Sequence, residues 1–243
     1  MEALLAFTAA LISLRLAGLL ARRRRAGGPP QLAAWAASLA AYAAASGALA
    51  WGAAAGWGDE AFRVYYLFGG LLTAPLLGVG SLLLAGRRWA APLGLLYTGL
   101  AVGVALAVPL TSPVGGESIP EAQEHLDFVP ARLVAVLGNT IGTLAVVTIA
   151  LLTIRRRPLG NALILAGVAV AAAGSGLAGT GVAETAGFVA VAALLLYAGF
   201  VAPTARARRT ERSLSLTSRM QSSGRSPTSA ENAAKASRSS DSE

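Results

Sequence analysis

The side chains of this sequence that could bind a metal or catalyse a reaction gather in the stretch 111–130. It holds four candidate ligands for a divalent cation, which are Glu121, Glu124, His125 and Asp127. If residues 121–125 form a helical turn, Glu121 and His125 lie on one face at positions i and i+4, and carboxylates with an imidazole suit a divalent metal. The alternative is a solvated acidic loop, since a single histidine among acids is common at a protein surface.

The rest of the sequence holds no arrangement of residues that is typical of an enzyme. The chain contains no cysteine, which excludes disulfides, thiolate nucleophiles and Cys-ligated metals. The HExxH, GxSxG, Walker and GxGxxG patterns do not occur in a suitable context. We therefore expect a protein that is not an enzyme, with no catalytic residues and no cofactor.

Four residues inside long apolar runs are further candidates for a functional role. Arg15 lies seven residues before Arg22, about 10 Å along a helix, so its side chain either reaches toward the basic cluster there or faces another helix. Asn139 and Thr143 are neutral polar residues that either join helices by hydrogen bonds or line a polar cavity. Pro75 removes one helical hydrogen bond and is expected to kink its helix.

The elements that carry these residues are strongly apolar. Of the 243 residues, 55% are hydrophobic and 13% are charged, against about 25% charged in a typical soluble domain. The mean hydropathy is +0.60. Apolar runs of about 19 to 25 residues are long enough to cross a hydrocarbon core of about 30 Å. This pattern excludes a soluble enzyme, a nucleic-acid-binding domain and a disordered chain.

An all-α fold with seven transmembrane helices follows from these runs. Each run must be helical, because an isolated segment in lipid can satisfy its backbone hydrogen bonds only internally. The predicted spans are 3–21, 32–56, 62–85, 90–110, 131–154, 159–181 and 185–203. They make up a membrane domain over 1–203, and 204–243 forms a separate tail.

The charges of the connections predict the orientation of the chain. The connections after the first, third and fifth runs carry nine arginines, at 22–25, 87–88 and 155–157, and no acids. Acidic residues gather in the other three connections. By the positive-inside rule, the N-terminus lies outside and the C-terminus lies in the cytoplasm. The net charge of +8 reflects this segregation by membrane side, and we expect no nucleic acid partner.

The tail 204–243 is rich in Ser, Thr and Arg and has no periodic apolar positions, so we expect it to be disordered. Four arginines follow the last run directly, namely Arg206, Arg208, Arg209 and Arg212. We expect them to attract anionic lipid headgroups, at about 1 kcal/mol per basic residue. They either fix the topology alone or are regulated by phosphorylation of neighbouring serines and threonines.

Small residues predict how the helices pack, because lipid tails are as apolar as leucine and close backbone contact must hold the helices together. The pairs Gly99/Gly103 and Gly138/Gly142 share a four-residue spacing. We expect both to pack helices within the chain, with a homo-oligomer or another protein partner as the alternative.

Aromatic residues gather at the expected outer ends of the second and third runs. They are Trp51, Trp57, Phe62, Tyr65 and Tyr66. Amphipathic rings suit the level of the lipid headgroups, so the sequence predicts an aromatic belt at this end.

Three resemblances to known families bear on the function. The topology is similar to that of microbial rhodopsins, but these need a lysine in the last span for the retinal Schiff base, and the one lysine here is Lys235, in the tail. The pair Pro30–Gln31 resembles PQ-loop and SWEET-type carriers, although the second half of the chain has no such pair. The stretches AFRVYYLFGGLL at 61–72 and LGNALI at 159–164 resemble a group of bacterial seven-helix membrane proteins of unassigned function. That resemblance implies a bacterial plasma membrane and no catalytic residues.

Three functions are compatible with this sequence. The first is a non-enzymatic interaction or structural component of a bacterial plasma membrane, which predicts a bundle packed solid by Ala and Gly. The second is a transporter of a small neutral solute or lipid, which predicts a central cavity near Asn139, Thr143 and the Pro75 kink. The third is a metal-dependent membrane enzyme, which requires the acidic side chains at 121–127 to converge.

Overall fold

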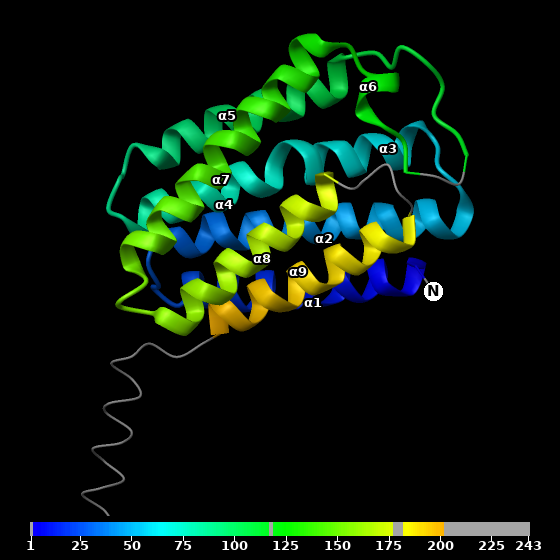
Figure 1. Cartoon of the computed structure of the whole chain (residues 1–243). Helices are drawn as coiled ribbons and strands as arrows, with labels where there is room; N and C mark the ends of the chain where they lie inside the picture. Colours follow the sequence, from blue (N-terminus) through cyan, green and yellow to red (C-terminus); the bar gives the residue numbers. More distant parts are fainter. Residues whose placement is uncertain (1, 117–118, 177–181, 202–243) are drawn as a thin grey trace, which may run out of the picture. The chain divides into compact units, whose positions relative to one another are not determined.

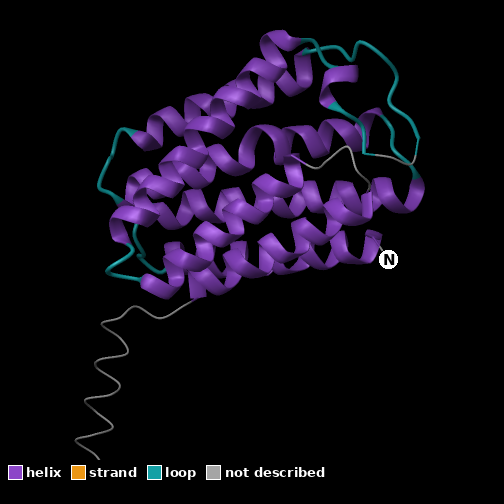
Figure 2. Cartoon of the chain, viewed as in Figure 1, coloured by secondary structure: helices purple, strands orange, loops and turns teal. Residues whose placement is uncertain are grey.

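Helices account for nearly all of the described part of the chain. The computed structural model describes residues 2–116, 119–176 and 182–201, and no strand occurs among them (Figure 2). The predicted all-α fold is thereby confirmed. The chain divides into two units, Met1–Ala202 and Pro203–Glu243. The predicted tail, with Arg206, Arg208, Arg209 and Arg212, lies outside the described residues.

The helices coincide with the apolar runs. In chain order they are α1 (Glu2–Arg25), α2 (Gln31–Ala55), α3 (Asp59–Tyr65), η1 (Tyr66–Leu72), α4 (Thr73–Leu84), α5 (Ala90–Ala107), α6 (Ala122–His125), η2 (Phe128–Arg132), α7 (Leu133–Thr153), α8 (Pro158–Gly176) and α9 (Val182–Val201). In the described part of the chain, five helices are long and apolar enough to cross a membrane: Ala3–Arg25, Gln31–Ala55, Asp59–Leu84, Ala90–Ala107 and Phe128–Thr153. Shorter apolar stretches, Pro158–Gly174 and Gly187–Gly199, lie within α8 and α9. These helices are consistent with a multi-pass membrane protein.

Glycine and proline mark where several of these helices begin and end. Gly86 follows α4 with a φ of 81°, and the N–H of Arg87 donates to the carbonyl of Leu82 at 3.0 Å, which is the pattern of a Schellman motif. Gly56 follows α2 with a φ of 86°, a conformation that glycine adopts without strain. Pro158 is the first residue of α8, where its missing N–H costs no helical hydrogen bond.

Six helices pack side by side in a closed ring in the described part of the chain. α1 contacts α2, α2 contacts α4, α4 contacts α7, α7 contacts α8, α8 contacts α9, and α9 contacts α1. α5 lies outside this ring, against α4 and η1. Successive helices run in opposite directions (Figure 1), so the arginine clusters at 22–25, 87–88 and 155–157 lie at one end of the bundle. We call this the basic end, and the opposite end, with the long connection 108–127, the acidic end.

Glycine lets α4 and α7 cross in close backbone contact. A Cβ atom added to Gly78 would lie 2.6 Å from the Cα of Gly142, and one added to Gly142 would lie 2.8 Å from the Cα of Pro75. Around Gly99 and Gly103, no atom outside their own helix turns lies within 4 Å of such a Cβ. The two glycine pairs therefore differ, since one packs inside the chain and the other lies on the exposed face of α5.

The aromatic residues at the acidic end differ from the predicted belt. Trp51 is 67% exposed, as a belt residue would be, but Trp57 and Phe62 are only 5% and 1% exposed. They belong to a packed cluster that includes Leu126 from the long connection. Gly52 makes this possible, because a Cβ there would lie 2.7 Å from Cδ2 of the Trp57 indole ring. The belt prediction is therefore wrong for Trp57 and Phe62, because the long connection packs over them.

Arg63 joins the third helical run to the end of α5. Its guanidinium donates to the carbonyls of Ala105 at 2.8 Å and Val108 at 3.0 Å. In a continuing helix the Ala105 carbonyl would accept from residue 109, but Pro109 has no N–H. Arg63 supplies the missing donor and also places a positive charge at a helix C-terminus, where the helix dipole favours it.

Candidate functional site

The third helical run changes its hydrogen bonding just before Pro75. Here η1 is π-helical, and the N–H of Thr73 donates to the carbonyl of Phe68. The Thr73 hydroxyl donates to the same oxygen at 2.7 Å. Because proline has no N–H, the Leu71 carbonyl lacks its donor in the α-helical register, and the Gly70 carbonyl lacks it in the π-helical register. Where the sequence predicts a kink, the structure has a segment with carbonyls open to side-chain donors.

Side chains from α7 and α5 donate to these two carbonyls, and a side chain from α2 donates to the carbonyl of Thr73, the first residue of α4. They are Asn139 of α7, to Gly70 at 2.8 Å; Tyr97 of α5, to Leu71 at 2.9 Å; and Ser38 of α2, to Thr73 at 2.7 Å. Gly138 makes room for the Tyr97 hydroxyl, which would collide with a Cβ there. A buried carbonyl without a donor is costly in an apolar environment, so these bonds hold η1 in place between α2, α5 and α7.

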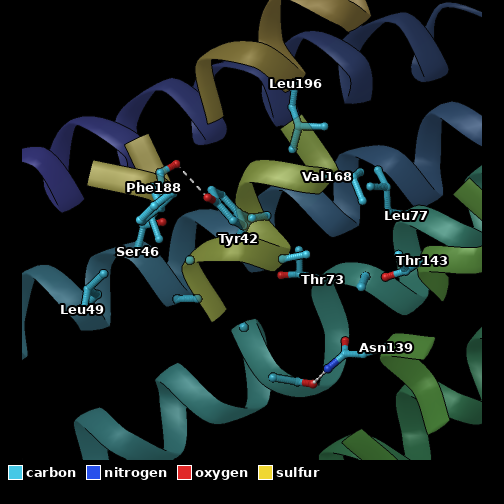
Figure 3. Close-up of a pocket in the computed structure, with 18 of the residues that line it drawn as sticks. Tyr42, Ser46, Leu49, Thr73, Leu77, Asn139, Thr143, Val168, Phe188 and Leu196 are labelled. Carbon is cyan, nitrogen blue, oxygen red and sulfur yellow. Dashed lines mark hydrogen bonds between the residues drawn. The ribbon is translucent and has the colours of Figure 1, made fainter. Parts of the chain in front are cut away.

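A cavity of about 530 Å³ lies beside η1. Its wall includes Tyr42, Ser46, Leu49, Thr73, Leu77, Asn139, Thr143, Val168, Phe188 and Leu196 (Figure 3). These residues come from α2, α4, α7, α8 and α9, and most of them lie near the middle of their helices. The cavity is therefore near mid-depth of the bundle, beside the helical run that contains Pro75.

The cavity wall is apolar with a few hydroxyl and amide groups. None of the described residues that line it carries a charge. The Tyr42 hydroxyl donates to the carbonyl of Val189 at 2.8 Å. Asn139 uses its amide nitrogen on Gly70, which leaves its Oδ1 without a partner among the described residues. The hydroxyls of Ser46 and Thr143 likewise form no hydrogen bond with a described residue. The hydroxyl of Tyr66, another lining residue, is also buried without a partner among the described residues. The lining residues thus offer one free acceptor, Asn139 Oδ1, and three hydroxyls that can both donate and accept.

The acidic connection forms a different arrangement. The short α6 begins at Ala122, so Glu121 precedes it in an extended conformation with a ψ of 128°. The His125 Nδ1 lies 2.8 Å from the Ser112 hydroxyl, and its ring packs edge-on against Phe62. In the described ranges, no group of three His, Asp or Glu residues is placed to hold a metal ion. Glu124 and Asp127 therefore form no such group with His125.

Arg15, the remaining candidate, and Asn161, a further polar residue of the bundle, occupy clear positions. Arg15 lies on the exposed face of α1, so its side chain does not face another helix of the described bundle. Asn161 is buried at the start of α8 and donates to the Ala150 carbonyl at 3.2 Å and the Thr153 hydroxyl at 2.8 Å, which joins α8 to the end of α7. Burial lowers the pKa of Arg157, next to this contact, below its usual value.

Asn139, Thr143 and the segment before Pro75 come together at the cavity, as the transporter hypothesis requires. Sequence reasoning did not assign Tyr42, Ser46 or Phe188 to the same site. Their positions in the middle of apolar runs could have marked them as candidates. Which helix faces them across the cavity, however, depends on the order of the helices in the ring.

Comparison with protein-family models, with curated proteins and with solved structures gives no match to this chain. The resemblance to bacterial seven-helix proteins therefore stays a prediction, and the function is inferred from the cavity.

Proposed function

We propose that this chain is a seven-helix protein of a bacterial plasma membrane that binds a small neutral molecule in the central cavity and carries it across the bilayer. The observation that supports this is the cavity of about 530 Å³ lined by Asn139 and Thr143 beside the η1 segment. The basic end faces the cytoplasm in this proposal, because its arginines satisfy the positive-inside rule, and the N-terminus is outside.

The chemistry of the wall indicates a neutral ligand. An isolated charge in an apolar site costs far more than a hydrogen-bonding neutral group, and no described lining residue could neutralise one. A volume of about 530 Å³ falls within the range of about 300–1,000 Å³ for small-molecule sites, which are mostly apolar with a few polar groups that set orientation.

The structural-component hypothesis is less well supported. It predicts a solid interior, and the crossing at Gly78 and Gly142 is packed in that way. The space between α2, α7, α8 and α9 is not. The third hypothesis, a metal enzyme, receives no support from the position of His125, whose Nδ1 is within hydrogen-bonding distance of Ser112.

The test is ligand-dependent stabilisation of the full chain in lipid nanodiscs. Two panels of neutral compounds are compared, water-soluble polyols such as glycerol and bilayer-dissolved alcohols such as hexadecanol. A ligand at 100 times its Kd stabilises the folded state by about 2.7 kcal/mol, which raises the unfolding temperature. Compounds that do so are then tested for flux into proteoliposomes.

The matched variants are Thr143→Trp and Thr148→Trp, both on α7. Thr143 lines the cavity and Thr148 is exposed on the outer side. We expect Thr143→Trp to abolish the stabilisation and the flux, and Thr148→Trp to retain both. Equal loss in the two variants, or no stabilisation by either panel, would contradict the proposal.

A further inference from the structure

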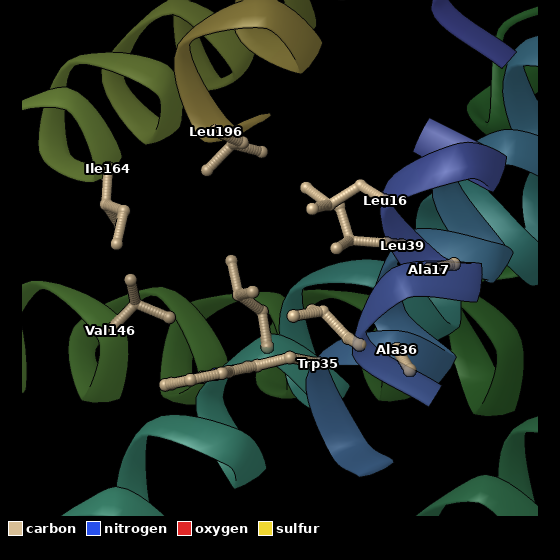
Figure 4. Close-up of a cluster of buried hydrophobic side chains, with 10 residues drawn as sticks. Leu16, Ala17, Trp35, Ala36, Leu39, Val146, Ile164 and Leu196 are labelled. Atoms are coloured by element: carbon tan, nitrogen blue, oxygen red, sulfur yellow. The ribbon is translucent and has the colours of Figure 1, made fainter. Parts of the chain in front are cut away.

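Packed side chains close the cavity toward the basic end. Leu77, Val146 and Leu196 line the cavity and also belong to a buried cluster with Trp35 and Ile164 (Figure 4). This cluster joins α1, α2, α4, α7, α8 and α9. Among the described residues, a molecule in the cavity therefore reaches the basic end only if this cluster repacks.

The described residues toward the acidic end are also packed. Leu49 lines the cavity and is fully buried in the cluster that contains Trp57 and Phe62. Tyr65 and Val189 line the cavity as well and pack against the same cluster. These side chains separate the cavity from the long connection 108–127.

Among neighbouring helices of the ring, α7 and α8 contact each other least in the described part of the chain. Near their shared connection, Asn161 of α8 bonds Ala150 and Thr153 of α7. Farther from it the two helices diverge (Figure 1), and α8 packs on α9 instead, where Gly174 lies against Phe188. Ala172 of α8 lines the cavity and is at the same time exposed, which places it where the cavity meets the outside of the bundle, and we call this position the rim.

The free polar groups specify the head of the ligand. Asn139 and Thr143 stand at positions i and i+4 and are neighbours on one helix face. The free Asn139 Oδ1 can only accept, whereas the Thr143 hydroxyl can donate. A hydroxyl group on the ligand satisfies both, because it donates to the amide oxygen and accepts from the threonine. The aliphatic wall at Leu77 and Val168 suits a hydrocarbon tail.

We infer that the cavity takes up a long-chain alcohol from the bilayer itself, sideways between α7 and α8, with the alcohol's hydroxyl group on Asn139 and Thr143. This inference rests on the proposed function and names its substrate class as a lipid-dissolved amphiphile. A water-soluble solute would have to enter from one end of the bundle, and packed clusters of described residues flank the cavity at both ends.

The experiment uses the full chain in phosphatidylcholine nanodiscs and a hexadecanol that carries a photoreactive diazirine in its tail. After irradiation, mass spectrometry locates the labelled peptides. We expect labelling of the α7 and α8 peptides that contain Thr143 and Val168. An excess of plain hexadecanol should reduce this labelling about tenfold or more, and glycerol should not. Labelling at the outward-facing Leu144 and Leu151, which contact lipid in this proposal, is expected to persist.

Variants at the rim test the route. Ala172→Trp should slow the labelling of Thr143 about tenfold, whereas Ala173→Trp, next to it on α8 but not lining the cavity, should leave it unchanged. Ala172→Leu provides a smaller obstruction at the same position if Ala172→Trp lowers the unfolding temperature.

The outcomes separate this inference from the proposed function. If glycerol competes, or if a larger side chain at Ala172 leaves the labelling rate unchanged, the sideways route is overturned while a ligand site at Thr143 stands. If neither compound protects the cavity peptides and neither stabilises the fold, the proposed function fails as well.

Discussion

The crossing of α4 and α7 makes a strong prediction for the variant Gly142→Ala. A Cβ at this position would collide with the carbonyl oxygen of Ala74 and lie 2.8 Å from the Cα of Pro75. Ordinary carbon contacts begin at about 3.4 Å, and both neighbours are backbone atoms of a packed helix. Relief therefore requires α7 and α4 to move apart, which would also disturb the Asn139 bond to η1.

The expected magnitude follows from two opposing effects. Overpacking a well-packed contact costs about 1–3 kcal/mol, while replacing a helical glycine by alanine gains about 0.5–1 kcal/mol. Because the obstacle here is backbone, we expect the upper part of the first range to prevail. Gly142→Ala should then lower the free energy of unfolding by about 2 kcal/mol.

The matched control is Gly103→Ala on α5. This glycine is exposed and no atom lies within 4 Å of its added Cβ, so only the gain of about 0.5–1 kcal/mol remains. The assay is equilibrium unfolding of the full chain in mixed micelles with increasing dodecyl sulfate. The reasoning is refuted if Gly142→Ala is as stable as Gly103→Ala.

Two further predictions concern carbonyls that a proline leaves without a donor. Asn139→Leu and Tyr97→Phe each remove one donor to η1. We expect each to cost about 0.6 kcal/mol and at most about 1.7 kcal/mol, the average and the maximum for interhelical hydrogen bonds in membranes, in the same dodecyl sulfate titration. Arg63→Gln should speed amide hydrogen exchange in the last turn of α5, whose carbonyls Arg63 now binds, and leave α7 unchanged. Unaltered stability or exchange would show that water replaces these donors.

The prolines illustrate how far local sequence reasoning extends. Pro75 predicts a disturbed helix from its own chemistry, because it lacks an N–H wherever it stands. The donors that compensate it are 22 and 64 residues away, at Tyr97 and Asn139. Sequence spacing carries no signal for such a pairing. The sequence does indicate that Asn139 needs a partner, because it is a polar residue in the middle of an apolar run.

The same contrast holds at the acidic end. The sequence places Trp57 and Phe62 next to a membrane interface, and the expectation of a belt follows from their ring chemistry. Their burial depends on the long connection, which packs Leu126 against them, and on Gly52, which leaves space for the indole ring. These contacts join segments that the local pattern treats separately.

The sequence by itself determined that the chain is helical, which runs form the helices, and which connections share a charge. These properties are local, because chain length, apolar composition and backbone hydrogen bonding act within one run. Only the tertiary structure decided which glycines touch another backbone, since the pairs 99/103 and 138/142 have the same spacing and opposite surroundings. It also decided that Tyr42, Thr143 and Phe188 enclose one cavity, because packing between helices depends on ring order and rotation, and neither is encoded in the spacing of any single run.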